Sequence, residues 1–514
     1  MTHVLASIVA APALAAAALL LTPRSAKLAV RAISLAGAVV SLVLSAFVAF
    51  DFVKSTGGLQ FLQSYPLVPS LGITLKLAVD GWGVALLLLT GLIIVTGVFS
   101  SWSVERRDKE FFILLLVLVS GVFGVFVAQD LFVFFLFYEI AVLPMYLLIG
   151  IWGASHKVPP SGPFRAAWKR FDVGSKEYAA MKLTLMLLVG SAAILVAMFM
   201  LWAGAGAHTF DLQVLQATKY PLATQHGIFV LVWLGFGTLA GVFPFHTWSP
   251  DGHASAPTAV SMLHAGVLMK LGAFGVMRIG MVLAPAAAEL WAPVVGAVAV
   301  INVLYGAWCA AHQTDLKYIV AYSSVSHMGV VMLGAATMTG AGWNGAVYQM
   351  VAHGIMTGLF FGLVGMVYER AHTRAIAKMG GFAHRMPAVA AFFTLACLSS
   401  LGLPGTAGFV AEFMVFVGAA KSPQPWWAIP GVVGAFITAV YVLRACKTIF
   451  WGPPPEGEFA YLTDARGTEW VTPVVLGAAL VVFGFWPRLL LDFIDLASSD
   501  FLRRLPLLAM GALP

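Results

Sequence analysis

Long apolar runs, separated by short polar stretches, make up nearly the whole chain. A helix needs about 20 apolar residues to span the hydrocarbon core of a membrane. About fourteen runs approach this length, and they lie near residues 4–22, 30–50, 77–100, 111–128, 131–152, 180–202, 225–243, 258–280, 291–311, 318–339, 344–368, 388–420, 426–451 and 470–492. Because backbone polar groups must be satisfied within the bilayer, we expect helices rather than strands. The pattern predicts an all-α, polytopic membrane protein.

The composition agrees with this class. Of the 514 residues, 61% are hydrophobic and 10% are charged, whereas a soluble domain carries about 25% charged residues. Such a chain cannot cover a water-facing surface, so lipid must surround it. The net charge of +7 does not indicate a nucleic-acid partner, because Lys and Arg lie in short loops between apolar runs. Cys309, Cys397 and Cys446 lie far apart in apolar segments, without disulfide or metal spacing.

The distribution of Lys and Arg predicts the orientation of the chain. Basic residues gather after the first, third, fifth and eleventh runs, and an excess of this kind is typical of cytoplasmic loops. Because the number of spans is even, both termini are expected on the outer side. No Lys or Arg precedes the Ala-rich residues 4–22, so we interpret them as a spanning helix and not as a signal peptide. The tail 493–514 is mildly amphipathic and is expected at the membrane interface.

Two of the runs are interrupted by residues that break helices. One contains Pro244, Pro250 and Pro257, and the other contains Gly402-Leu403-Pro404-Gly405. Broken helices at matching places of two halves indicate an inverted-repeat transporter, although a Pro that merely kinks its helix is the alternative for each break. The breaks lie five spans apart, and a tandem repeat of five spans must be inverted. The predicted organisation is helices 1–3 in 1–110, a first repeat of helices 4–8 in 111–280, a second repeat of helices 9–13 in 291–451, and a last helix with an interfacial tail in 452–514.

Three charged residues lie near the centres of apolar runs. They are Glu139 in LFVFFLFYEIAVLPMYLLIG, Lys270 in SMLHAGVLMKLGAFGV, and Glu412 in FVAEFMVFVG. A charge at mid-helix costs about 2.5–3.5 kcal/mol on insertion scales, so it normally faces a partner or a water-filled cavity and marks an ion or proton route. Burial brings the pKa values of Glu and Lys toward neutrality, which suits groups that take up and release protons.

Histidines extend this set. His327 and His353 lie in apolar helices, and His264 precedes Lys270 by six residues. Imidazole titrates near neutral pH, so these residues could join the carboxylates and the amine in a proton relay. A histidine that is simply packed and hydrogen-bonded remains the alternative, above all for His264. The sequence contains no cysteine cluster for iron–sulfur, no dinucleotide glycine motif after a strand and no haem pattern.

Five long blocks resemble one known family. They are FYEIAVLPMYLLIGIWG, FPFHTWSPDGHASAPTAVSMLHAGVLMKLGAFGVMRI, QTDLKYIVAYSSVSHMGVVMLG, YQMVAHGIMTGLFFGLVGMVYERAHTR and LGLPGTAGFVAEFMVF. In this order they resemble subunit M (NuoM) of bacterial complex I, the respiratory NADH:quinone oxidoreductase, over roughly residues 75–450. The chain is too short for the larger subunit L with its lateral helix. Glu412 is an acid where the L and N paralogues usually carry Lys, which again favours the M type.

The resemblance implies an antiporter-like, proton-translocating subunit of the bacterial inner membrane, with both termini periplasmic. It implies fourteen spans, two inverted five-helix repeats and a central polar axis. The relay residues that it implies are Glu139, Lys270, His327, His353 and Glu412, with Lys182, His264 and His246 as ancillary candidates. It also implies that this chain holds no cofactor or metal. NADH, FMN, iron–sulfur clusters and quinone would belong to partner subunits, and the neighbours would be L- and N-type membrane subunits within the lipid bilayer.

One position departs from the pattern of the family. The family usually carries a Lys in the seventh span, five residues before the Pro of the PFH motif, and this chain has Leu239 there. Glu139 would therefore lack its usual cationic partner. Lys182 could substitute for that Lys, His264 could change the route of proton uptake, or the first half of the relay could be altered. These three alternatives stay open, as do a Na⁺/H⁺ exchanger subunit, a membrane-bound hydrogenase subunit, and a scaffold with impaired pumping.

Overall fold

The computed structural model describes residues 3–54, 57–156 and 171–510. Within these ranges, thirteen helical spans are long and apolar enough to cross a membrane. The first nine run over α1 (Val4–Leu21), α2 (Lys27–Asp51), α3 (Gly81–Ser100), α4 (Asp108–Val127), α5 (Leu131–Trp152), α7 (Lys176–Gly204), α9 and α10 (Leu222–Ala240 and Trp248–Ser255), α11 and α12 (Thr258–Leu263 and Met269–Gly275), and α13 (Pro285–Ala311). The other four are α14 (Leu316–Ala336), α15 (Gly340–Ala371), α18 (Ala428–Phe450) and α19 (Val471–Phe485).

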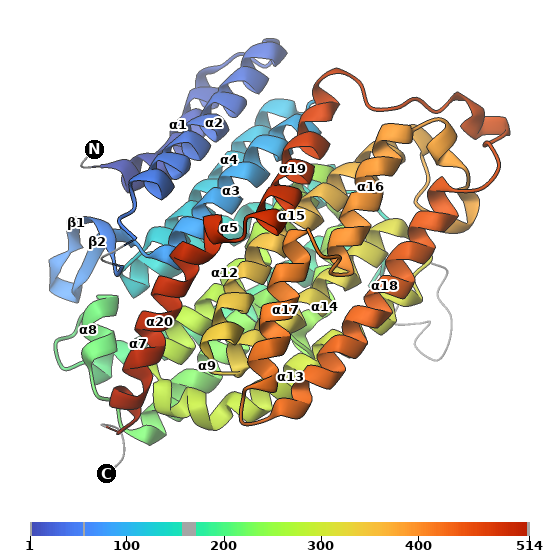
Figure 1. Ribbon diagram of the computed structural model, residues 1–514. Coiled ribbons are helices and arrows are strands. Elements are labelled where there is room, and N and C mark those ends of the chain that lie inside the picture. The colour runs from blue at the N-terminus through green and yellow to red at the C-terminus, as the bar shows by residue number, and fades with distance from the viewer. Residues whose placement is uncertain (1–2, 55–56, 157–170, 511–514) are drawn as a thin grey trace.

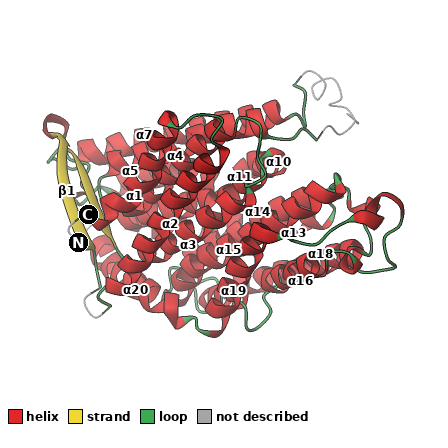
Figure 2. Ribbon diagram, turned by 90° about the horizontal axis from the view of Figure 1, so that it is seen from above, coloured by secondary structure: helices red, strands yellow, loops and turns green. Residues whose placement is uncertain are grey.

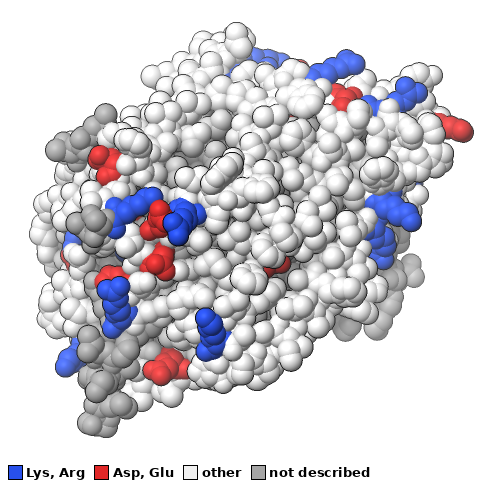
Figure 3. Space-filling view, viewed as in Figure 1, with Lys and Arg blue, Asp and Glu red and all other residues white. Residues whose placement is uncertain are grey.

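Two further apolar helices complete the set. They are α16 (Pro387–Ser400) and α17 (Ala407–Ala420). Each has 14 residues, a length of about 21 Å, which is short of the hydrocarbon core. Together they form the broken twelfth span, so the all-α class and the expected fourteen spans are confirmed. The spans run side by side through one bundle (Figures 1 and 2). Charged side chains gather toward two opposite margins of the face in Figure 3, with a broad, almost uncharged expanse between them.

The start of the third predicted span was wrong. Residues 77–79 belong to β2 (Ile73–Val79), which pairs with β1 (Gln60–Val68) in an antiparallel hairpin. The helix begins only after Asp80, whose side chain accepts a hydrogen bond from the N–H of Gly83 at 3.0 Å. This hairpin precedes the span and lies beside α8 (Leu212–Ala217) in Figure 1. We call this end of the bundle the hairpin face and the other end the opposite face.

The last predicted span was too long. The helix α19 ends at Phe485, and a separate helix, α20 (Arg488–Met510), follows Pro487. The ring of Pro487 removes a backbone donor and so favours the interruption. The new helix packs on the start of α3, where the indole N–H of Trp82 donates to Ser498 at 3.0 Å. The predicted interfacial tail is therefore a helix that covers the hairpin face of the bundle.

The two breaks lie where Pro and Gly predicted them. The helix α9 ends at Gly241, which has φ of 74°, and two side chains from elsewhere satisfy the freed backbone. The indole of Trp248 donates to the carbonyl oxygen of Thr238 at 2.9 Å, and Asn302 accepts from the N–H of Phe243 at 2.8 Å. Irregular backbone at membrane depth needs such partners. Two π-helical segments that the sequence did not predict, His264–Leu268 and Val276–Met281, flank α12 in the eighth span.

The helices of the two predicted repeats pack in the same order. Helix α4 packs on α5 as α13 packs on α14, and α5 packs on α7 as α14 packs on α15. Helix α7 packs on both parts of the seventh span, α9 and α10, as α15 packs on both parts of the twelfth, α16 and α17. Because five spans separate each helix from its counterpart, the second repeat runs in the opposite direction through the membrane. The arrangement thus has the predicted inverted order.

A short backbone bridge recurs in both repeats. Asp130 caps the start of α5 and pairs with Asp211, and Asp315 caps the start of α14 and pairs with Ala375. In the first bridge, Leu131 donates its N–H to the carbonyl oxygen of Phe210 at 2.8 Å. The second bridge has the corresponding bond, at 2.9 Å, one residue after its aspartate. We call these two features the first and second clasps.

Candidate functional site

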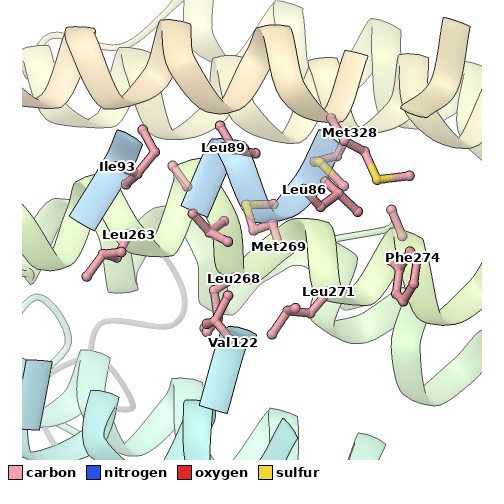
Figure 4. Close-up of a cluster of buried hydrophobic side chains, with 14 of the residues drawn as sticks. Leu86, Leu89, Ile93, Val122, Leu263, Leu268, Met269, Leu271, Phe274 and Met328 are labelled. Carbon is pink, nitrogen blue, oxygen red and sulfur yellow. The ribbon is translucent and has the colours of Figure 1, made fainter. Parts of the chain in front are cut away.

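Lys270 lies in the middle of the bundle, on α12, directly after a π-helical segment. Its side chain is fully buried. The ammonium group donates to the carbonyl oxygen of Ala265 and lies 2.7 Å from Nδ1 of His353 on α15. Apolar side chains from α3, α4 and α14 close around the neighbouring Met269 and Leu271 (Figure 4). Lys270 thus makes its polar contacts with the carbonyl of Ala265 and with His353, inside a shell of apolar side chains.

A chain of polar groups continues from His353. Its ring centre is 5.2 Å from that of His327 on α14, and Nδ1 of His327 is 3.3 Å from the carboxylate of Glu412 on α17. The amide of Gln349 approaches the same Nδ1 at 3.2 Å, and the hydroxyl of Ser400 approaches Nε2 at 3.2 Å. The structure therefore brings four of the five predicted relay residues, from Lys270 to Glu412, into one continuous file.

The second helix break lies at the end of this file, beside Glu412. Gly402 has φ of 74°, a conformation that glycine adopts without strain. A Cβ at this position would lie 2.8 Å from Oε2 of Glu412. The glycine therefore gives the carboxylate room beside the turn between α16 and α17. The turn at the break thus makes space for the acid.

Glu139 stands apart from the file. The Ser191 hydroxyl on α7 interacts with its carboxylate and contacts the Tyr138 hydroxyl at 3.3 Å. Oε1 of Glu139 is buried without a hydrogen-bond partner, and no Lys or Arg of the described ranges forms an ion pair with it. Leu239 is fully buried at the end of α9. At the position where the family usually has a lysine, the structure thus places a buried apolar side chain.

Lys182 does not pair with Glu139. Its ammonium lies 2.8 Å from Asp251 on α10, and the hydroxyl of Tyr318 donates to the same carboxylate at 3.1 Å. Lys182 also precedes Ser191 by nine residues on α7, a rise of about 13 Å. This lysine belongs to a polar cluster toward the opposite face. The adjoining Lys317 is buried there, with its ammonium 2.6 Å from the carbonyl oxygen of Ala256.

His264 packs against a histidine that the sequence analysis did not single out. The ring centres of His264 and His253 are 3.9 Å apart, and both side chains are fully buried. His246 lies elsewhere, with its ring 5.0 Å from that of Tyr305 near the first break. His253 lies in the block that begins with FPFHTW, but its contact with His264 across the helix break could not be predicted from the sequence.

Gln349 is a second residue that sequence reasoning missed. It precedes His353 by four residues on α15, and side chains four apart share one helix face. That spacing was the available signal. Asp80 and Arg278 form a third missed feature, a buried ion pair near the hairpin face in which Arg278 also contacts Gln129 at 3.1 Å.

Comparison with known proteins identifies the family. Residues 166–438 match the transmembrane family described as NADH:quinone oxidoreductase/Mrp antiporter. A relative from Trichormus variabilis, named NAD(P)H-quinone oxidoreductase chain 4, is 38% identical, over 96% of this chain and 90% of that protein. A chain 4 relative from a Picosynechococcus species is 39% identical, over 96% and 92%.

Solved structures agree in fold. A chain of respiratory complex I from Thermus thermophilus superposes with a TM-score of 0.84 at 30% identity, covering 97% of this chain and 99% of that one. A chain of the Mrp complex from a Dietzia species gives a TM-score of 0.81 at 20% identity, over 100% and 99%, a likeness of fold alone. The chain therefore belongs to the NADH:quinone oxidoreductase/Mrp antiporter transmembrane family.

Proposed function

We propose that this chain translocates protons as the M-type, antiporter-like subunit of an NAD(P)H:quinone oxidoreductase. One observation carries the proposal: Lys270, His353, His327 and Glu412 form a continuous file inside an apolar bundle. Amine, imidazole and carboxylate groups can each hold or release a proton. Ionisable groups at membrane depth mark proton routes.

The chemistry of the file is a sequence of proton exchanges. The ammonium of Lys270 faces Nδ1 of His353 as a donor, and a proton given up there leaves a neutral amine and a charged imidazole. The charged His353 then releases the proton of its other nitrogen, Nε2, to His327, whose ring centre lies 5.2 Å away. His327 in turn gives up the proton of Nδ1 to the carboxylate of Glu412, which ends the file at the second break. No electron moves in these steps. The redox chemistry belongs to partner subunits with NADH, FMN, iron–sulfur clusters and quinone.

The same proposal covers the setting of the chain. The subunit spans the bacterial inner membrane between L- and N-type neighbours. By the distribution of Lys and Arg, the hairpin face and both termini lie on the periplasmic side. The polar cluster around Lys182 and Asp251 then lies toward the cytoplasm. Labelling of single cysteines in the hairpin by an impermeant reagent on intact cells would test this orientation.

The matching family model also covers Mrp antiporters, which supports a second candidate, a subunit of a Na⁺/H⁺ exchanger complex. A third candidate is a scaffold without pumping, since Leu239 leaves Glu139 without a cation. The chain 4 relatives cover nearly the whole chain at higher identity, which favours the oxidoreductase. The intact file from Lys270 to Glu412 favours pumping over a scaffold role.

The substitution Glu412→Gln tests the function. It keeps the size of the side chain but removes its ability to carry a proton. We expect fewer protons translocated per electron in membrane vesicles, while quinone reduction persists when an uncoupler is present. Glu289→Gln, at an exposed position on α13, is the matched control. An unchanged proton-to-electron ratio in Glu412→Gln membranes would refute the relay role of this residue.

A further inference from the structure

Two histidines in ring contact form a buried polar pair that the file from Lys270 to Glu412 does not use. His253 on α10 and His264 in the π-helical segment have ring centres 3.9 Å apart. Both rings are fully buried, and none of their four ring nitrogens has a hydrogen-bond partner among the described residues. A buried polar group without a hydrogen-bond partner is destabilising. A packed histidine of ordinary kind, such as His226, instead has a partner, the indole of Trp291 at 3.0 Å.

The neighbours of the pair hold the two rings together. The ring of Trp248 stacks on His264 with centres 5.0 Å apart, and the ring of Phe361 stacks on His253 at 5.4 Å. Gly252 lets the two helices approach, because a Cβ there would lie 3.1 Å from Cε1 of His264. The rings therefore sit in a narrow slot with aromatic walls. Their contact with each other is held by residues that make no polar contact with them.

The pair lies between two lysines. On one side, Lys270 folds back along its helix and donates to the carbonyl oxygen of Ala265, the residue next to His264. On the other side, Lys317 donates to Ala256, three residues after His253. The groups that act electrostatically on His253 are His264, Lys270 and Lys317. The two histidines thus lie between the polar cluster near the opposite face and Lys270, where the file begins.

The alternative route to Lys270 is interrupted. It would pass from Glu139 through the position of Leu239, and that side chain is apolar and fully buried. A leucine can neither accept nor donate a proton. The chain therefore has an apolar gap on one approach to Lys270 and a pair of titratable rings on another.

We propose that protons reach Lys270 from the opposite face through the contacting pair of His253 and His264, which bypasses the gap at Leu239. The inference rests on the proposed function and adds the uptake route to it. A proton arriving at the free ring nitrogen of His253 releases the proton of the other nitrogen to His264. His264 passes a proton to the Lys270 amine in the same way. One proton moves inward, each ring ends as its other tautomer, and no electron is transferred.

The test uses vesicles that contain the whole oxidoreductase, with proton translocation measured per electron. His264→Leu removes the titratable ring, and His253→Gln is the second variant in case the first one fails to assemble. We expect both to lower the ratio by the same fraction as Lys270→Met. His226→Leu, which removes a histidine that has a protein partner, is the matched control and should leave the ratio unchanged.

A rescue experiment separates the route from a structural effect. Leu239→Lys restores a titratable group on the other approach, so we expect it to raise proton translocation in the His264→Leu background. It should change little by itself. A loss of packing at His264 would not be repaired by a lysine on α9.

The outcomes distinguish the two proposals. If Lys270→Met and Glu412→Gln lower the ratio but both histidine variants keep it, the uptake route is wrong and the function stands. If neither Lys270→Met nor Glu412→Gln changes the ratio, the proposed function itself fails. A loss in His264→Leu that Leu239→Lys does not rescue would also contradict the bypass.

Discussion

The ammonium of Lys270 and Nδ1 of His353 face each other at 2.7 Å in the centre of the bundle. This contact joins the eighth span to the eleventh, so it links the two inverted repeats by a pair of groups that can share a proton. The π-helical segment before Lys270 contributes to it, because the side chain turns back to the carbonyl of Ala265. The file of the second repeat thus begins on a residue of the first.

Lys270→Met should separate function from assembly. Burying an amine is costly, and an apolar side chain of similar volume is often neutral or stabilising in its place. We therefore expect a complex that assembles and reduces quinone when uncoupled, but translocates fewer protons per electron. Native gels and vesicle acidification measure the two properties. A complex that fails to assemble would show that the contact with His353 is mainly structural.

Gln349 is expected to control the transfer between His327 and Glu412. Its amide and the carboxylate approach the same ring nitrogen, at 3.2 and 3.3 Å. That nitrogen can accept from the amide when it is unprotonated and donate to the carboxylate when it is protonated. Gln349→Met, which keeps the length of the side chain, should lower the rate of proton translocation without loss of assembly.

A proton inventory in mixtures of H₂O and D₂O provides the second readout for this variant. A change in its solvent isotope effect would place Gln349 beside the transferred proton. Equal isotope effects and equal rates in the variant and the unmodified complex would exclude that role. Gln313→Met, which lies at the end of α13 away from the file, serves as the matched control.

The two clasps should respond differently to the same substitution. The carboxylate of Asp130 accepts from the N–H groups of Thr74, Phe132 and Val133, and burial raises its pKa above the usual value. An Asn can keep the two cap bonds from Phe132 and Val133 on its oxygen, because Asn caps helices about as well as Asp, but its amide nitrogen cannot accept from Thr74, so Asp130→Asn should lose one of the three bonds. Asp130→Ala should cost about 1 kcal/mol. Thermal denaturation of the purified complex measures both.

Asp315 has an additional partner. Its carboxylate lies 3.2 Å from the guanidinium of Arg374, and both side chains are at most 7% exposed. Removing one member of a buried ion pair costs about 3–5 kcal/mol, so Asp315→Asn should destabilise the complex more than Asp130→Asn does. Equal stability of the two Asn variants would contradict the assigned difference between the clasps.

Two glycines should differ sharply in their tolerance of alanine. A Cβ at Gly121 would lie 2.6 Å from the backbone nitrogen of Ala141, so α4 and α5 would have to separate. A Cβ at Gly97 would only touch Ala259 at 3.6 Å, an ordinary contact. We expect Gly121→Ala to abolish assembly and Gly97→Ala to preserve it, as judged by the yield of intact complex. Normal assembly of Gly121→Ala would mean that the helix packing is looser than described.

The fold was largely predictable because its signals are local. Apolar length defines the spans, and the Pro and Gly residues at 244 and 402–405 mark the breaks. The hairpin was missed because its strands are short and merge with the apolar run that follows. The two π-helical segments left no signal either, since they change the hydrogen-bond register without changing the apolar composition.

The candidate site was predictable as a set of residues but not as an arrangement. Ionisable groups in apolar runs stand out in any sequence, and Lys270, His353, His327 and Glu412 do lie together. The pairing of His253 with His264 depends on how α10 packs across a helix break, and no periodicity contains that information. The same holds for Lys182, whose pairing with Asp251 rather than Glu139 is decided by tertiary packing.

The two clasps have a consequence when a proton gradient stands across the membrane. One short aspartate-capped bridge is used twice, and inversion places the copies at opposite ends of the bundle. Asp130 and Asp315, both buried, therefore lie toward opposite sides of the membrane. When the complex acidifies one compartment, the first and second clasps therefore lie on sides of the membrane with different proton concentrations. Proton translocation by the subunit thus affects the two clasps, which hold the repeats in place, to different extents.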